Sequence, residues 1–88
     1  MIKIKCYLVD LKLADLKASQ AENALNEGPY NKKKYTEYKK TQKKQEEAFN
    51  KFANELSKLM KKERDNKFDL YIRLNFEKIE NLINNIEE

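Results

Sequence analysis

The chain has 88 residues, the length of one small domain spanning 1–88, and a formal net charge of +4. It has no His, one Cys and one Gly, which excludes His-dependent catalysis, imidazole metal sites, an internal disulfide and glycine-rich phosphate loops. No apolar run approaches the roughly 18 residues of a membrane span. We therefore expect a cytoplasmic, non-enzymatic protein without membrane contact, metal or cofactor.

The first nine residues alternate between two sets of side chains. Ile2, Ile4, Cys6 and Leu8 share one side, and the residues between them share the other. A period of two is typical of a half-buried strand, so the sequence predicts a strand here. Cys6 falls on the apolar side, where we expect it to act as a small buried hydrophobic residue.

A helix is predicted to follow, with Asp10 as its N-cap. Its small residues would let a second helix approach closely. Gly28-Pro29 should end it, because Gly suits the left-handed position after a helix and Pro cannot continue one. The predicted packing face has steps of three and four: Leu11, Ala14, Ala18, Ala21 and Leu25.

A second, longer helix is predicted from about Pro29 to Arg64, a stretch without any helix breaker. Its apolar and aromatic positions recur with the three-four spacing of a coiled-coil seam. We expect Tyr35 and Tyr38 to pack on the first helix and Tyr30 to be exposed. The complete predicted seam is Tyr35, Tyr38, Gln42, Gln45, Phe49, Phe52, Leu56 and Leu59.

The last third of the sequence predicts a strand and a helix. Apolar residues alternate with polar ones from Phe68 to Phe76, and Asn75 can cap a final helix with apolar positions at Ile79, Leu82, Ile83 and Ile86. The predicted fold class is α+β in the order β-α-α-β-α. A long antiparallel helical hairpin would pack on a small sheet of two parallel strands, with a C-terminal helix. The open strand edges and the polar residues Gln42 and Gln45 in the seam predict a homodimer.

Positive charge is concentrated in the middle of the chain, where residues 31–67 carry 13 basic and 6 acidic side chains. Helical spacing places six lysines on an arc of about 140° opposite the seam. They oppose the helix macrodipole and include repelling i,i+4 pairs, and such violations are expected at functional surfaces. With Tyr30 they form the candidate macromolecule-binding surface: Lys32, Lys33, Lys39, Lys40, Lys43 and Lys44.

The partner predicted for this surface is an acidic protein surface or nucleic acid. Lys, Asn and Ile have A/T-rich codons, and their abundance indicates an A/T-rich genome. We expect a non-catalytic accessory or inhibitory protein of a phage or other mobile element, acting on host nucleic-acid machinery or a defence complex. The alternatives are weakly sequence-specific nucleic-acid binding, a structural subunit of a homo-oligomer, and an ordinary solvated helix face.

Overall fold

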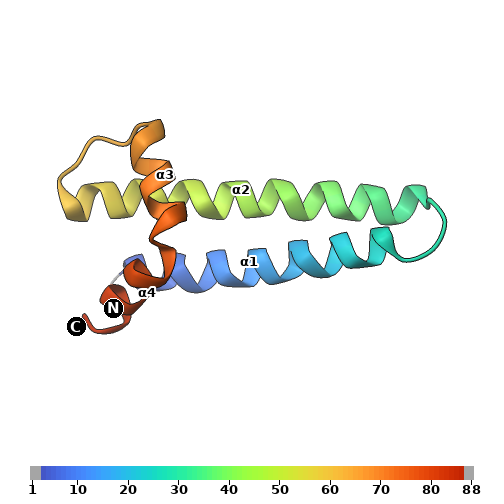
Figure 1. The fold of residues 1–88 in the computed structure, drawn as a ribbon, viewed down its shortest axis with the longest axis horizontal. Coiled ribbons are helices and arrows are strands. Elements are labelled where there is room, and N and C mark those ends of the chain that lie inside the picture. The colour runs from blue at the N-terminus through green and yellow to red at the C-terminus, as the bar shows by residue number, and fades with distance from the viewer. Residues whose placement is uncertain (1–2, 87–88) are drawn as a thin grey trace.

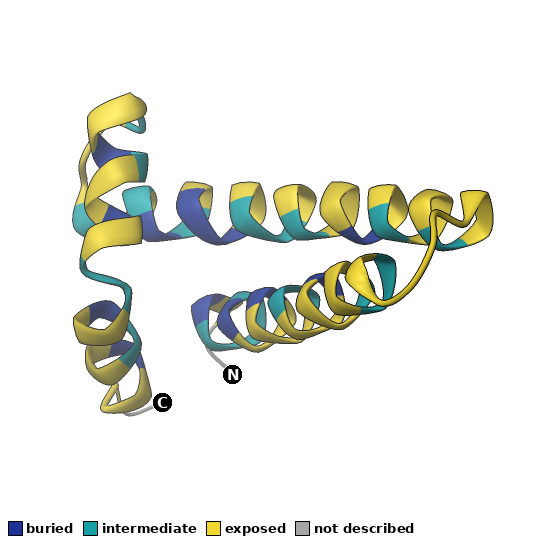
Figure 2. Cartoon of the chain, turned by 45° about the vertical axis from the view of Figure 1, so that its right-hand side comes forward, coloured by how far each residue is buried: buried dark blue, intermediate teal, exposed yellow. Residues whose placement is uncertain are grey.

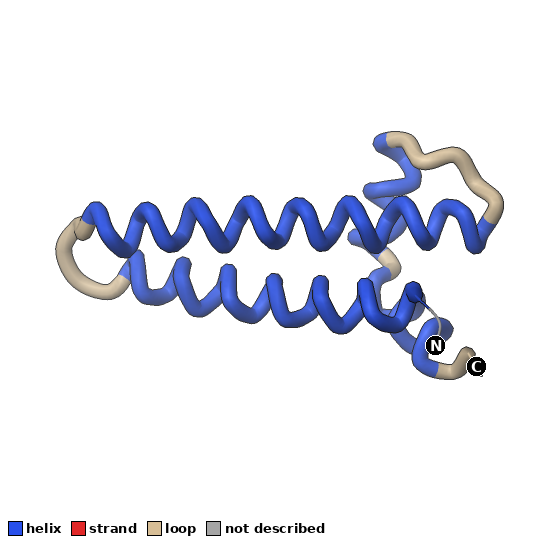
Figure 3. Tube along the Cα trace, turned by 180° about the vertical axis from the view of Figure 1, so that it is seen from behind, coloured by secondary structure: helices blue, strands red, loops and turns tan. Residues whose placement is uncertain are grey.

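A computed structural model describes residues 3–86, and over these residues the chain forms four helices and no strand (Figures 1 and 3). The predicted α+β fold class is therefore wrong, and the protein is all-α. The helices are α1 (Lys3–Asn26), α2 (Lys32–Met60), α3 (Asn66–Leu74) and α4 (Phe76–Asn84).

Helices α1 and α2 form the predicted antiparallel hairpin (Figure 1). Gly28 has φ +81°, a left-handed conformation that costs a residue without Cβ little, and Pro29 follows it. Asn31 then caps α2, because its side chain accepts hydrogen bonds from the backbone N–H groups of Lys33 at 2.9 Å and Lys34 at 3.3 Å. We call the connection of residues 27–31 the hairpin tip.

The predicted first strand is instead the start of α1, as far as it lies within the described residues; Ile2 lies outside them. Ile4 and Leu8 of the alternating set are spaced by four residues, and Leu11 follows three residues later, so these residues also lie on one side of a helix. A helix satisfies its backbone hydrogen bonds locally, whereas an isolated pair of strands is marginal in water. Asp10 consequently lies inside α1 and is not an N-cap.

The predicted second strand is also helical. The Asp65 side chain accepts a hydrogen bond of 2.8 Å from the backbone N–H of Phe68 and so caps α3. Phe68 and Ile72, four residues apart, are buried, whereas Leu70 and Leu74 from the same alternation are exposed. The period of this segment is therefore that of a helix, and α4 follows it after Asn75.

Asn75 occupies the N-terminal boundary of α4, as predicted, but its side chain does not cap that helix. It donates instead to the backbone carbonyl of Tyr71 in α3, at 3.1 Å. Among the predicted apolar positions of α4, Ile79 and Ile83 are buried and Leu82 is exposed.

The hydrophobic core lies at the end of the hairpin opposite the tip, where α3 crosses α2 and α4 lies beside the start of α1 (Figures 1 and 2). Lys12 forms an ion pair of 2.6 Å with Glu80, and Lys5 donates to the carbonyl of Ile86 at 2.6 Å, which fixes α4 on α1. Cys6 is half-buried within α1. The core residues are Ile4, Leu8, Leu11, Phe52, Ala53, Leu56, Phe68, Ile72, Ile79 and Ile83.

Arg64 joins α2 to α3. Its guanidinium donates to both carboxylate oxygens of Asp69, at 3.0 and 3.2 Å. It also donates to the side-chain oxygens of Asn50 at 2.7 Å and Asn54 at 2.8 Å. One planar group thus holds the loop between the two helices against both of them.

Helix α2 is rotated slightly relative to its predicted seam. Gln42 and Leu59 are exposed, whereas Thr41 is buried and Ala48 is half-buried. The reason is that α2 packs on two sides, against α1 through the row that includes Thr41 and Ala48, and against α3 and α4 through the row that includes Phe49. The sequence predicts one packing row, which lies between the two rows that the structure shows.

Candidate macromolecule-binding surface

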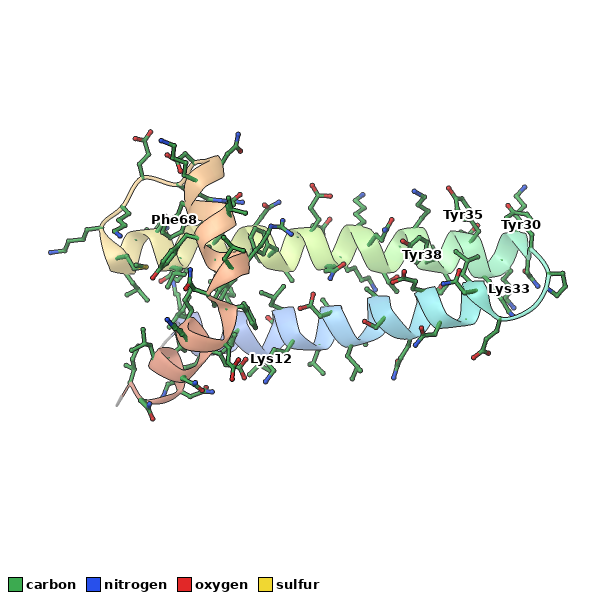
Figure 4. The ribbon with its side chains drawn as sticks, in the orientation of Figure 1. Lys12, Tyr30, Lys33, Tyr35, Tyr38 and Phe68 are labelled. Carbon is green, nitrogen blue, oxygen red and sulfur yellow. The ribbon has the colours of Figure 1, made fainter. Side chains whose placement is uncertain are left out.

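The six lysines predicted as a binding surface lie on the first half of α2 and are all exposed. Tyr30, from the hairpin tip, is also exposed, with 73% of its surface accessible. We call these seven residues the basic surface: Tyr30, Lys32, Lys33, Lys39, Lys40, Lys43 and Lys44. Figure 4 shows Tyr30 and Lys33 at the closed end of the hairpin, and Lys12 and Phe68 toward the opposite end.

The six lysines form two rows along the helix, because residues seven and four apart share a side at 100° per residue. One row contains Lys32, Lys39 and Lys43. The other contains Lys33, Lys40 and Lys44. At a rise of about 1.5 Å per residue, each row is roughly 16 Å long, which is long enough to contact several groups on a partner.

None of these lysines has a carboxylate within ion-pair distance among residues 3–86, where the ion pairs are Lys12–Glu80 and Arg64–Asp69. The first turn of α2 contains no acidic residue that would offset its lysines. Lysines at a helix N-terminus are each unfavourable by about 0.3–1 kcal/mol at low salt. Their charge is therefore not neutralised by carboxylates of the described chain and is available to a partner.

Lys34 differs from the other lysines of the first half of α2, because its side chain contacts the hairpin tip. It is half-buried, and its ammonium group donates to the backbone carbonyl of Glu27 at 3.5 Å. That carbonyl lies just after the C-terminus of α1, where a cation is favourable. The structure therefore places Lys34 outside the basic surface, in agreement with its helical position.

The tyrosines differ from one another. Tyr38 is half-buried, and its hydroxyl accepts a hydrogen bond of 2.6 Å from Gln42. Tyr35, which the sequence predicts to pack on α1, is 40% exposed, and its ring centroid lies 6.2 Å from that of Tyr30. Lys39 lies over the Tyr35 ring at 5.5 Å. An exposed aromatic pair with a cation therefore stands at one end of the basic surface (Figure 4).

A groove between α1 and α2 borders the lysine row that contains Lys44. Its apolar residues include Leu13 and Ala14 of α1 and Ala48 of α2, and its rim carries charges of both signs. Lys17 of α1 lies there, a residue that the sequence does not associate with this surface, because the register of α1 on α2 had to be known first. The charged residues of this groove are Asp10, Lys17, Glu37, Lys44, Glu47 and Lys51.

A second groove lies between α1, α2 and the C-terminal helices, but its polar groups are largely satisfied within the chain. Asp15 accepts a hydrogen bond of 2.5 Å from Gln45, and Asp69 is held by Arg64. Arg73 lies over the Phe49 ring at 4.5 Å from its centroid. These contacts hold α3 and α1 against α2, so we assign this groove a structural role.

Comparison of the chain with protein-family models, curated proteins and solved structures finds no match. Within the described part of the chain, no group of three or more metal-ligating side chains is brought together. No helix of residues 3–86 is both long and apolar enough to cross a bilayer. The indications of function are therefore the charge, exposure and shape of this chain.

Proposed function

We propose that the protein is a non-catalytic binding protein of the cytoplasm that docks its basic surface onto an acidic surface of a partner protein. The observation that carries this proposal is the set of six exposed lysines without carboxylate partners among the described residues. Such a surface attracts an acidic partner over several ångströms and speeds its association. An accessory or inhibitory role at a host enzyme or defence complex would need this kind of docking and no catalytic group.

A protein partner fits the charge pattern around the lysines better than a phosphate chain does. Glu37 lies among them, and Glu46 and Glu47 lie two and three residues after Lys44. A phosphate backbone is negative along its whole length, so these carboxylates would repel it. A protein surface can match both signs residue by residue.

Capture from extracts of the source cell tests the proposal, with the wild type and a variant that replaces Lys33, Lys40 and Lys44 by Gln. We expect a captured protein that survives nuclease treatment and is lost with this variant. A matched control replaces Lys51, Lys58 and Lys67 by Gln, which removes the same charge outside the basic surface. Equal capture by both variants would contradict the proposed role of the basic surface.

Direct nucleic-acid binding is the second candidate, and the exposed pair of Tyr30 and Tyr35 favours it. Aromatic rings stack bases without regard to sequence while lysines hold phosphates. If four lysines contact duplex phosphates, log affinity should fall against log salt with a slope of about −3.6, which is more than a hundredfold between about 50 and 300 mM.

A mobility-shift titration at three salt concentrations separates the two candidates. Nucleic-acid binding predicts that the Lys33, Lys40 and Lys44 to Gln variant lowers the salt slope on duplex by about two to three units. It also predicts equal weakening on random duplexes and single strands, because no base is read. Binding that is absent, or that the variant leaves unchanged, eliminates this candidate.

A further inference from the structure

Helix α1 carries exposed apolar side chains outside its contact with α2, and one of them, Leu13, also lines the edge of the groove between the two helices. Val9, Leu13 and Leu16 are 55%, 52% and 55% exposed, respectively. Their spacing of four and three places them in one row, which Gln20 continues. We call Val9, Leu13 and Leu16 the outer face of α1; Figure 2 shows this helix exposed along its side away from α2.

The opposite side of α1 is also apolar, because it contributes Ile4, Leu8 and Leu11 to the core. A helix of a small soluble protein usually has one apolar stripe, and a helix that is apolar on several sides is usually enclosed by neighbours. Within residues 3–86, α4 borders the outer face through the Lys12–Glu80 ion pair but leaves Val9, Leu13 and Leu16 exposed.

We propose that the outer face of α1 packs against the outer face of a second copy, with the two α1 helices antiparallel. The spacing 9, 13, 16, 20 is that of the core positions of a coiled coil. In the antiparallel alignment, Leu13 of each copy lies opposite Leu16 of the other, and Val9 lies opposite Gln20. Two leucine layers then form the centre of the contact.

Charge complementarity selects the second copy and its orientation. Asp10 and Lys17 flank the outer face on the same side, seven residues apart, and neither has an ion-pair partner among residues 3–86. The antiparallel alignment brings Lys17 of each copy beside Asp10 of the other. A parallel, in-register alignment would instead bring Lys12 beside the second copy's Lys17, two like charges.

The contact is made by α1, whereas the basic surface lies on α2 and the hairpin tip, so none of the seven residues of the basic surface takes part in it. It reaches the edge of the groove beside Lys44, because Asp10, Leu13 and Lys17 line that groove, and it does not depend on the proposed function. The two hairpin tips would point in opposite directions, about 40 Å apart at 1.5 Å per residue. The shared face is shorter than α1 and smaller than the roughly 800 Å² per partner of a standard interface. We therefore expect a dissociation constant on the order of 10–100 µM.

Sedimentation velocity on the full chain between about 5 and 500 µM tests the proposal. The wild type is expected to convert from monomer to dimer across this range. Leu13→Glu should shift the conversion at least tenfold toward higher concentration, because it places charge in a leucine layer. Leu74→Glu is the matched control: Leu74 is 75% exposed on α3, outside this face, and its replacement should leave the conversion unchanged. Circular dichroism should show the wild-type helical content for both variants.

Charge reversal tests the orientation. Asp10→Lys and Lys17→Asp should each weaken the dimer several-fold, because each variant creates like-charge pairs across the contact. The double variant recreates two opposite-charge pairs and should return the dissociation constant to within about twofold of the wild type. A wild type that stays monomeric at 500 µM, or a Leu13→Glu variant that dimerises as the wild type does, would overturn the proposal. A double variant as weak as the single ones would overturn the antiparallel arrangement.

Discussion

Phe52 is fully enclosed at the centre of the core, with the Phe76 ring centroid 6.1 Å from its own. Phe52→Ala removes a large side chain that its neighbours cannot replace, so we expect it to lower the free energy of unfolding by about 3–5 kcal/mol. Urea denaturation monitored by circular dichroism measures this change.

Lys40→Ala is the matched comparison, on the exposed side of the same helix. It removes the i,i+4 repulsion with Lys44 and should leave the free energy of unfolding unchanged or raise it by about 0.2–0.5 kcal/mol. A loss as large as that of Phe52→Ala would mean that the buried side of α2 is assigned wrongly.

Arg64 links α2 to α3 through the hydrogen bonds of its guanidinium group. Lysine retains the positive charge but cannot donate to Asp69, Asn50 and Asn54 in one plane. We expect Arg64→Lys to lower the free energy of unfolding by about 1–2 kcal/mol, measured by urea denaturation. Its combination with Asp69→Asn should cost less than the sum of the two single changes, because both remove the same interaction; strict additivity would contradict the network.

At the scale of elements, the hairpin could be predicted from the sequence, whereas the secondary structure of residues 3–9 and of residues 68–76 could not. The Gly28-Pro29 break and the long stretch without breakers correctly predicted two helices joined in a hairpin, although α1 begins at Lys3 and not at Asp10. The two strand predictions were wrong because some of the alternating residues also lie four residues apart on one side of a helix, as Ile4 with Leu8 and Phe68 with Ile72 show. Period-two and helical patterns coincide over short segments, and only packing on α2 decides between them.

The end of α2 carries a conformation that the sequence did not reveal. Lys61 has φ 54° and ψ 42°, the left-handed region that favours glycine. Lys61→Gly should therefore raise the free energy of unfolding by about 0.5–1 kcal/mol. Lys58→Gly, inside the last turn of the same helix, should lower it by about 0.5–1 kcal/mol. Thermal unfolding of both variants checks the two signs; a destabilised Lys61→Gly would contradict the left-handed cap.

At the scale of the whole molecule, the apolar core and the basic surface occupy opposite ends of a rod of 47 × 26 × 18 Å. The sequence predicted this division, because the second half of the long helix contains Phe and Leu where the first half contains Tyr and Gln. It placed six lysines and Tyr30 on the exposed side correctly. It could not place Tyr35 beside Tyr30 or Lys17 beside Lys44, because both depend on the geometry of the hairpin.

This division predicts a gradient of local stability along the hairpin. Near the tip, the buried residues are small, as Ala18 and Thr41 show, whereas large side chains fill the other end. Amides of residues 20–26 and 36–40 should exchange with deuterium at least tenfold faster than those of residues 52–58. Hydrogen exchange read by NMR measures this difference. Uniform protection along both helices would show that the hairpin opens only as one unit.

The pairing of Lys12 with Glu80 and of Lys5 with the Ile86 carbonyl has a consequence during protein synthesis. Ile4 and Leu8 share the core with Ile79 and Ile83, which are translated 75 residues after them (79 − 4 and 83 − 8). At roughly 5–20 residues per second, these apolar side chains wait several seconds for their last partners. The α1–α2 hairpin can form in that interval, but its N-terminal end stays incompletely covered until α4 is translated. A nascent chain halted before residue 79 should therefore be a better chaperone substrate than one that includes α4.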